Sequence, residues 1–354
     1  MSLLLGLDQG STKTHAIVVT QSGEILGTGS APGSLHTVYG MDAALGRMHE
    51  ACAQALSNAG HAFADIEWAS GGITGIDYPY EEALLQSAIS AHFGLRPENV
   101  FVNNDCMGAL WGGTFHAPAV VCCVGTGLAV GGADEAGHAH IFGNYCNGYY
   151  QGGSSIGQDA LQHVFDAAIG LRTPTSLTQK FLAFAHAKDV DELLLLRYRK
   201  KTVEPSRLCP LVFEAAGEGD AVAISILETF ARRWGEITLC MIDALGLSRS
   251  APIEVILSGS VFKGVPAIPY RVIRNLFRVH APNAVLREAI YEPVVGGAAM
   301  GLFQIGQGDW RTALAASADR LHLRRNLEHE NLNPSDGRSG KRQGRVALYP
   351  ARRV

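Results

Sequence analysis

Long apolar runs, paired cysteine motifs and a strong excess of one charge are all missing from this chain of 354 residues. No run reaches the roughly 18 apolar residues that a membrane span needs, and the first residues have neither the basic start nor the cleavage site of a signal peptide. The formal net charge of −4 gives no reason to expect nucleic acid as a partner. We therefore expect a cytoplasmic protein that binds neither nucleic acid nor a membrane.

The cysteines form no recognisable metal or disulfide motif. Seven are present, an odd number, and none belongs to a Cys-x-x-Cys pair, which argues against both a disulfide framework and a zinc ribbon. Cys122 and Cys123 are adjacent in an apolar stretch, and neighbouring side chains of a strand point to opposite faces. These two thiols are therefore not expected to bind one metal ion together.

What the chain does have is enough hydrophobic sequence for a large core. Hydrophobic residues make up 47% of it, and its length predicts about two domains. Segments with helical apolar spacing, such as 42–60, 81–93, 159–169 and 220–246, occur together with short apolar strands. This mixture predicts an α/β fold.

The opening segment is the most informative one. An apolar strand ends at Asp8, turns through Gly10, Ser11, Thr12 and Lys13, and continues into a second apolar strand. Gly10 leaves room for backbone N–H groups to approach phosphate oxygens, the two hydroxyls add donors, and Lys13 adds a positive charge. Asp8 offers the oxygen ligand that Mg²⁺ prefers. The segment predicts a hairpin that holds a metal-bound polyphosphate; the alternative is an ordinary glycine-rich hairpin with a solvated aspartate.

A second unit repeats this pattern. Residues 119–124 form an apolar strand, Gly125, Thr126 and Gly127 form a tight turn, and residues 128–132 form the returning strand. The two units lie about 115 residues apart, which predicts two similar domains that face each other. A phosphate chain would then lie between them.

Further segments place polar or small residues where strands end. A short strand at 101–102 precedes Asn104 and Asp105, and an apolar strand at 253–257 runs into a turn made of Ser258, Gly259 and Ser260. A glycine turn after a parallel strand lets the backbone lie close to a ligand, here an adenine or ribose. Residues 293–301 form a helix rich in small residues, which is suited to close packing and to a hinge.

Taken in order, these segments resemble the motifs of the sugar kinase, actin and Hsp70 superfamily. The resemblance is most specific to the BadF/BadG/BcrA/BcrD ATPase and N-acetylglucosamine kinase family, and it runs from residue 3 to about residue 303. It implies an α/β fold of two ribonuclease H-like (actin-like ATPase) domains that face each other across a nucleotide cleft. The matching segments are the first phosphate loop (8–14), the first connecting segment (104–105), the second phosphate loop (125–127), the adenosine motif (258–262) and the second connecting segment (296–298).

The resemblance also implies how the chain is divided. We expect an N-terminal actin-like domain at 1–115, a C-terminal actin-like domain with a helical insertion at 116–292, and C-terminal helices at 293–320 that return toward the first domain. A basic tail follows at 321–354, with eight Arg or Lys against three Asp or Glu. Its composition favours disorder, and a weak anion-binding arm is the alternative.

Roles for individual residues follow from the same resemblance. ATP and Mg²⁺ are the implied cofactors, with Asp8 as the metal anchor. Asp105 would be the catalytic base, because the corresponding carboxylate of the family's sugar kinases accepts the proton of the attacking hydroxyl; the alternative is a helix N-cap. The implied nucleotide and phosphate contacts are Gly10, Ser11, Thr12, Lys13, Gly125, Thr126, Gly127, Ser258, Gly259 and Ser260.

The sugar-binding residues match the family less well. Its acetylhexosamine kinases carry a Ser-Asn stretch after the second strand, Gly-Thr-Gly-Ser-Asn at the second loop, and Gly-Asp-Glu-Gly-Ser further on. The corresponding segments of this chain are 34–37, 125–129 and 152–155, and the last of them lacks both the Asp and the Glu of the family's segment. Loss of buried polar contacts argues for a different acceptor or for none. Residues that would line a replacement pocket are His36, Asp77, Asn104, Gly152 and Gly153.

The leading hypothesis is therefore an ATP-dependent kinase whose acceptor is a small hydroxylated molecule, an amino sugar or N-acetylhexosamine. A second hypothesis is a BadF-type ATPase that drives or regulates a partner protein without a sugar substrate. Such activators bridge a homodimer with a cysteine-bound iron-sulfur cluster, to which Cys122 and Cys123 are a poor match. A third is a nucleotide-binding regulator without catalytic activity. The resemblance is compatible with a homodimer.

Overall fold

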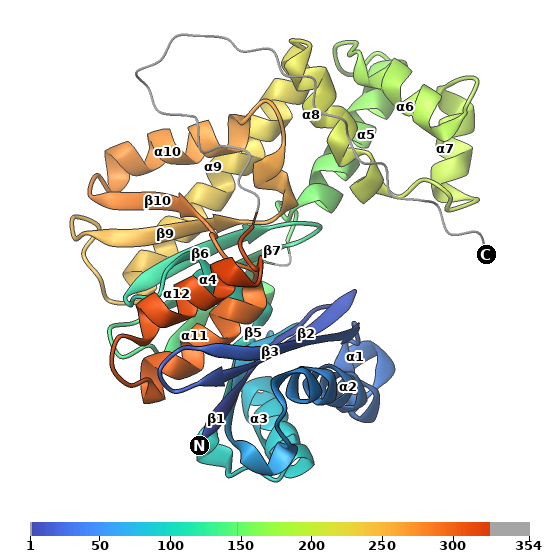
Figure 1. The fold of residues 1–354 in the computed structure, drawn as a ribbon. Helices are drawn as coiled ribbons and strands as arrows, with labels where there is room; N and C mark the ends of the chain where they lie inside the picture. Colours follow the sequence, from blue (N-terminus) through green and yellow to red (C-terminus); the bar gives the residue numbers. More distant parts are fainter. Residues whose placement is uncertain (1, 147, 326–354) are drawn as a thin grey trace.

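The computed structural model of the protein describes residues 2–146 and 148–325 (Figure 1). Two mixed β-sheets lie in separate lobes, with helices outside each sheet and between them. No helix of these residues is both long and apolar enough to cross a bilayer. The predicted basic tail falls mostly on residues 326–354, which lie outside the described part of the chain.

The N-terminal sheet has five strands in the order β3-β2-β1-β4-β5. Strands β1, β2 and β3 pair antiparallel, as hairpins do, whereas β4 and β5 join the other side of β1 in parallel. Parallel pairing needs a crossover connection, and a helix supplies it here. The strands are β1 (Leu3–Gln9), β2 (Lys13–Thr20), β3 (Ile25–Pro32), β4 (Ile66–Ile73) and β5 (Val100–Asn104).

The C-terminal sheet repeats this topology strand for strand. Its order is β8-β7-β6-β9-β10, with β6, β7 and β8 antiparallel and β9 and β10 parallel to β6. The duplication predicted from the two glycine turns is therefore confirmed, and with it the expectation of two ribonuclease H-like lobes. The strands are β6 (Ala119–Val124), β7 (Leu128–Ala133), β8 (Ala139–Ile141), β9 (Ile253–Ser258) and β10 (Ala284–Glu288).

Twelve α-helices of the described residues surround these sheets (Figure 1). Helices α6 and α7 form a helical insertion of the second lobe that projects away from both sheets (Figure 1). The helices are α1 (His36–Tyr39), α2 (Met41–Ala59), α3 (Pro79–Phe93), α4 (Asp105–Gly113), α5 (Gly153–Ala168), α6 (Leu177–Ala185), α7 (Val190–Tyr198), α8 (Cys209–Gly217), α9 (Ala221–Ala244), α10 (Ile268–His280), α11 (Pro293–Ile305) and α12 (Trp310–Arg320).

Alternation along the strands divides the core into layers. In β1, Leu3, Leu5 and Leu7 pack with α2 and α3 on the outer face, whereas Leu4 faces the opposite way into a cluster that contains α4 and α11. A strand covered on both faces has to be apolar on both, which explains its continuous leucine run. Helices α4 and α11 thus lie between the two sheets (Figure 1).

Helix α11 approaches its neighbours unusually closely because it carries small residues. A Cβ atom on Gly297 would lie 2.3 Å from the carbonyl oxygen of Leu7, and one on Gly296 would lie 1.9 Å from that of Gly108. Both separations are far shorter than van der Waals contact, so only glycine fits. The close packing predicted for this segment is confirmed, and its use as a hinge stays a prediction.

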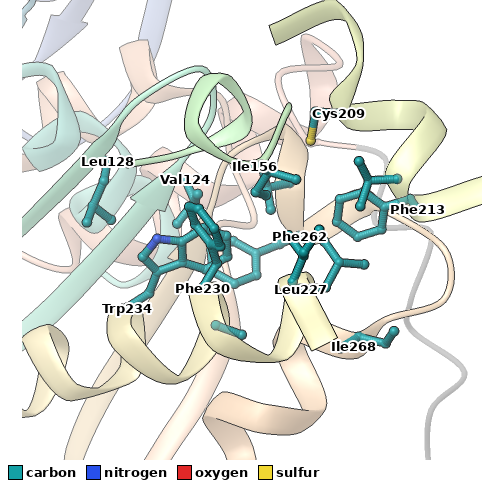
Figure 2. Close-up of a cluster of buried hydrophobic side chains, with 14 of the residues drawn as sticks. Val124, Leu128, Ile156, Cys209, Phe213, Leu227, Phe230, Trp234, Phe262 and Ile268 are labelled. Carbon is teal, nitrogen blue, oxygen red and sulfur yellow. The ribbon is translucent and has the colours of Figure 1, made fainter. Parts of the chain in front are cut away.

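A large hydrophobic cluster supports the second lobe behind the turn between β6 and β7. Val124 and Leu128 flank this turn, and Figure 2 shows them beside Trp234 and Phe230 of α9. The two rings are T-shaped with centroids 6.0 Å apart, a favourable aromatic geometry. Cys122 belongs to the same cluster, whereas Cys123 packs on the opposite face of the sheet. The expected divergence of these thiols is confirmed.

Candidate functional site

The first loop of the site is a short turn at the carboxyl end of β1. The hairpin register pairs Gln9 with Thr14, and the backbone N–H of Gly10 donates to the carbonyl of Lys13 over 2.8 Å. This closes the turn while Ser11, Thr12 and Lys13 remain exposed. The predicted hairpin is confirmed, and its free hydroxyl, ammonium and N–H groups can all donate to an anion.

Asp8 lies beside this turn in an electrostatically crowded place. Burial raises the pKa of Asp8 to about 7, and the negative charges of Asp105 and Glu292 act in the same direction. Arg325 and Lys13 oppose that rise. Desolvation and like charges both disfavour a carboxylate, and a bound cation would relieve both. The chemistry of this group therefore fits the predicted metal anchor.

Asp105 follows the last residue of β5 and is the first residue of α4. The N-cap is Asn104, whose side-chain oxygen accepts from the backbone N–H of Cys106 over 3.0 Å. Capping is thus done by the preceding residue, which leaves the Asp105 carboxylate at the helix start. Burial and the charge of Asp77 raise the pKa of Asp105, although hydrogen bonds from Thr74 and from the backbone N–H of Cys106 oppose the rise.

The second loop is held from behind by the start of α5. The backbone N–H of Gly153 donates to the carbonyl of Gly125 over 2.8 Å. A Cβ atom on Gly152 would lie 2.3 Å from the same carbonyl and 2.4 Å from that of Gly127. Gly152 and Gly153 therefore shape the predicted phosphate loop, Gly125, Thr126 and Gly127. These two glycines lie against the second loop and not beside the other predicted acceptor residues.

The third loop follows β9 and contacts the second. Gly259 has a φ of +108°, and a Cβ atom there would lie 2.2 Å from the carbonyl oxygen of Val124. Only glycine satisfies both conditions. A cavity of about 640 Å³ opens beside this contact, lined by residues that include Thr126, Ser260, Lys263 and Phe213. Two loops predicted separately thus share one cavity.

The two lobes meet at the ends of these strands. The charge of Asp105, in the first lobe, raises the pKa of the Cys123 thiol near the end of β6, although burial is the larger cause. In the same region, the side chain of Arg325 donates to the hydroxyl of Ser258 over 2.9 Å. The predicted metal anchor and base therefore lie near the second and third loops, where the two lobes meet.

The remaining predicted residues gather on the other side of Asp105. The side-chain amide of Asn104 donates to the carbonyl of Ile76 over 2.9 Å and to a carboxylate oxygen of Asp77 over 3.3 Å. Burial and the charge of Glu81 raise the pKa of Asp77, and His36 opposes this rise. Within the described residues, Nδ1 of His36 is buried and makes no hydrogen bond. Such an unsatisfied buried atom needs an explanation, and a bound ligand is one.

A second cavity, of about 520 Å³, lies next to this group. Asp77, Glu82 and Asn103 contribute its polar lining, and Ile141 and Phe142 come from the other lobe. Asn103 donates to Glu82 over 2.7 Å, which fixes one carboxylate oxygen. A cavity with carboxylate and amide groups on one side and apolar side chains on the other suits a small polyhydroxylated molecule that also has an apolar part.

Several residues of the cleft were not predicted. Glu292 and Arg325 act on Asp8, and Lys263 and Phe213 line the larger cavity. Lys263 directly follows the predicted adenosine motif, so its place in the sequence could have indicated a position near the nucleotide. Phe213 lies on α8 in the domain predicted at 116–292, and Arg325 lies in the predicted basic tail. No spacing or pattern in the sequence pointed to either.

The fit to Mg²⁺ and ATP can be judged from the donor groups alone. In residues 2–146 and 148–325, no group of three or more His, Cys, Asp or Glu side chains is placed to hold a metal ion. Protein-bound Mg²⁺ commonly takes only one or two carboxylates and completes its shell with phosphate and water oxygens. Asp8, two glycine loops and a cavity beside them fit such a metal-nucleotide complex.

Two lobes of equal strand order, with glycine loops and carboxylates between them, define the class of actin-like ATPase folds. Comparison with known proteins identifies the family within that class. Residues 5–301 match the BadF/BadG/BcrA/BcrD ATPase family, and the chain belongs to it. The resemblance inferred from the five sequence motifs is therefore confirmed.

Individual relatives are more distant. An N-acetyl-D-glucosamine kinase of Dictyostelium discoideum is 25% identical over 318 residues, which cover 85% of this chain and 98% of the relative. A protein from Chromobacterium violaceum proposed to be an N-acetylglucosamine kinase has a similar structure, with a TM-score of 0.59 and 20% identity over 86% of this chain and 99% of that chain. A ROK family glucokinase from Streptomyces griseus, solved with glucose and AMPPNP, has a TM-score of 0.50 and 19% identity over 86% and 98%. These structures establish the fold.

Proposed function

We propose that the protein is an ATP-dependent kinase that transfers the γ-phosphate to a small hydroxylated acceptor, an amino sugar or N-acetylhexosamine. One observation carries the proposal: Asp8 pairs in register with Gly72, where a Cβ atom would lie 2.9 Å from Cα of Asp105, so the proposed base and the proposed metal anchor would be neighbours. Phosphoryl transfer needs both groups within reach of the same phosphate. The names of the relatives, among them N-acetyl-D-glucosamine kinase, support the same class of acceptor.

The nucleotide would lie across the loops of both lobes. Backbone N–H groups of residues 11–13 and 126–127 would donate to phosphate oxygens, and the cavity of about 640 Å³ beside Gly259 would hold the adenosine. Asp8 would hold Mg²⁺, which neutralises charge on the phosphate oxygens when it is bound. Backbone donors fixed by hairpin geometry need little reorganisation, which favours transition-state stabilisation.

Asp105 would accept the proton of the attacking hydroxyl. A carboxylate suits this step because the proton leaves late, as charge moves onto the phosphoryl group. Burial raises the pKa of Asp105, which makes its carboxylate a stronger base. The acceptor would occupy the cavity of about 520 Å³, next to Asp77 and Asn103.

The direct test is ADP release from the purified protein with Mg-ATP, with and without a panel of amino sugars, N-acetylhexosamines and plain hexoses. Asp105→Asn should lower acceptor-dependent ADP release by about 100- to 10,000-fold and leave Mg-AMPPNP affinity nearly unchanged. Asp191→Asn is the matched control, because Asp191 also lies in the first turn of a helix, α7, but is exposed.

The outcomes separate the competing functions. Stimulation by one sugar that is lost in Asp105→Asn and kept in Asp191→Asn supports the kinase and identifies its acceptor. ADP release that no sugar changes contradicts it and favours an ATPase that acts on a partner protein. Nucleotide binding without any turnover, in the presence of the whole panel, contradicts both and favours a regulator.

A further inference from the structure

The segment that follows α12 returns to the cleft. The backbone N–H of Glu292 donates to the carbonyl of Leu323 over 2.9 Å, and that of Arg325 donates to the carbonyl of Ile290 over 2.8 Å. Between these bonds, Tyr291 and Arg324 form an antiparallel bridge. The first residues of the predicted basic tail are therefore paired with the segment that leads into α11, and the backbone position of Arg325 is fixed.

The side chain of Arg325 enters the space where the two lobes meet. Its Nη1 donates to Oγ of Ser258 over 2.9 Å. Ser258 is the last residue of β9 and pairs in register with Cys123 of β6. The positive charge of Arg325 also lowers the pKa of Asp8 and of the Cys123 thiol, against the effect of their burial. The guanidinium thus lies among the carboxyl ends of β1, β6 and β9.

The position of the Arg325 guanidinium matters because the residues around it are mostly acidic. Asp8, Asp105 and Glu292 are all acidic, and the charges of Asp105 and Glu292 both raise the pKa of Asp8. A polyphosphate brought into this cleft meets repulsion unless cations offset it. Lys13 is one such cation, but it is exposed on the first loop. Arg325 is partly buried and tethered, and a guanidinium can donate two parallel hydrogen bonds to a phosphate.

We infer that Arg325 binds the phosphate chain of the nucleotide. This arginine comes from the segment after α12, and none of the five motifs contains it. Ser258 holds the guanidinium in place before the nucleotide binds, so little ordering remains to be done on binding. This inference rests on the nucleotide-binding part of the proposed function. It does not depend on the identity of the acceptor.

The test compares ligands with and without phosphates in calorimetric titrations of the full-length chain. Arg325→Ala should weaken Mg-AMPPNP binding by about 10- to 100-fold, the loss expected for hydrogen bonds to a charged group. Adenosine affinity should change by less than about twofold, since adenosine offers no phosphate for the guanidinium to bind. Arg325→Lys should recover part of the loss, because it keeps the charge and loses the fork. Arg324→Ala is the control, an exposed arginine on the same bridged segment.

Each result decides the matter. Unchanged or tighter Mg-AMPPNP binding by Arg325→Ala overturns the inference, and tighter binding would mean that the guanidinium blocks the cleft. Equal weakening of adenosine and Mg-AMPPNP also overturns it, because Arg325 would then act on the fold of the cleft. If the wild-type protein binds no Mg-AMPPNP, both the inference and the proposed function fail. If the wild type binds it but no acceptor is found, only the kinase proposal fails.

Discussion

At the scale of single residues, Asp8 links the charge state of the site to its ligand. Because the pKa of Asp8 is raised to about 7 in the empty protein, a proton competes with the metal near neutral pH. Mg-AMPPNP affinity should therefore rise as the pH increases from about 6 to about 8, approaching tenfold per pH unit below the pKa. Asp8→Asn should bind weakly with little pH dependence. Calorimetric titrations at several pH values check this.

The raised pKa of Asp8 also makes the stability of the empty protein depend on pH. The pKa of Asp8 in the folded protein lies above the ordinary aspartate value of 3.8, so the folded state binds more protons than the unfolded state between these two pKa values. Stability contributed by Asp8 therefore falls as the pH rises through this window, and ionised Asp8 destabilises the fold at pH 7 and above. Asp8→Asn should raise the free energy of unfolding by about 1 to 2 kcal/mol near pH 8. An equal gain near pH 4 would contradict the assignment.

The residues of the site differ in how far the sequence could predict them. Gly10 and Gly125 were found because a strand, a glycine turn and a second strand form a local pattern that hairpin geometry requires. Asp105 was found through the resemblance, and its neighbour Asn104 turned out to be the helix cap. Arg325 could not be found, because its position depends on hydrogen bonds to residues 290–292 that no local pattern encodes.

At the scale of elements, the turn after β9 requires glycine at position 259 for two separate physical reasons. Gly259 has a positive φ, and a Cβ atom would also lie 2.2 Å from the carbonyl of Val124. Gly219 has a φ of +91° but open space around it. Gly219→Ala should therefore cost about 1 kcal/mol of unfolding free energy, from backbone strain alone.

Gly259→Ala should cost more than this matched control, by about 2 kcal/mol or more, because β6 and the turn must also move apart. Since the turn lies beside the larger cavity, adenosine affinity should fall as well, whereas Gly219→Ala should leave it unchanged. Chemical denaturation and adenosine titration measure the two effects. Equal stability losses in both variants would show that the close contact with Val124 does not constrain the turn.

The elements themselves were predictable where one segment carries its own signal. The helix predicted at 42–60 is α2, and the strands around the glycine turns are present with the expected pairing. Helix α5 begins at Gly153, six residues before the predicted start at 159. Its first turn contains glycine and serine, which are poor helix formers, and a hydrogen bond to Gly125 fixes where it begins. Tertiary contacts set that boundary, so the sequence could not.

At the scale of the whole molecule, two lobes of equal topology meet at the ends of their strands, with α4 and α11 between the sheets (Figure 1). The proposed phosphate contacts come from both lobes, and the smaller cavity is also lined from both, by Asp77 on one side and Phe142 on the other. Ligands that bind both lobes favour the state in which the lobes are closest. Nucleotide and acceptor together should therefore close the cleft.

Solution X-ray scattering tests this closure. The radius of gyration should decrease by roughly a few per cent with Mg-AMPPNP and the acceptor together, and by less with either alone, because each alone leaves one set of contacts unmade. Asp105→Asn should still close, since it loses a proton acceptor and keeps the contacts that hold both ligands. Closure by the nucleotide alone would mean that the acceptor cavity does not join the lobes. A radius of gyration that stays the same with both ligands would mean that the close packing of Gly296 and Gly297 against their neighbours prevents the lobes from moving. Helix α11 would then be a rigid connection and not a hinge.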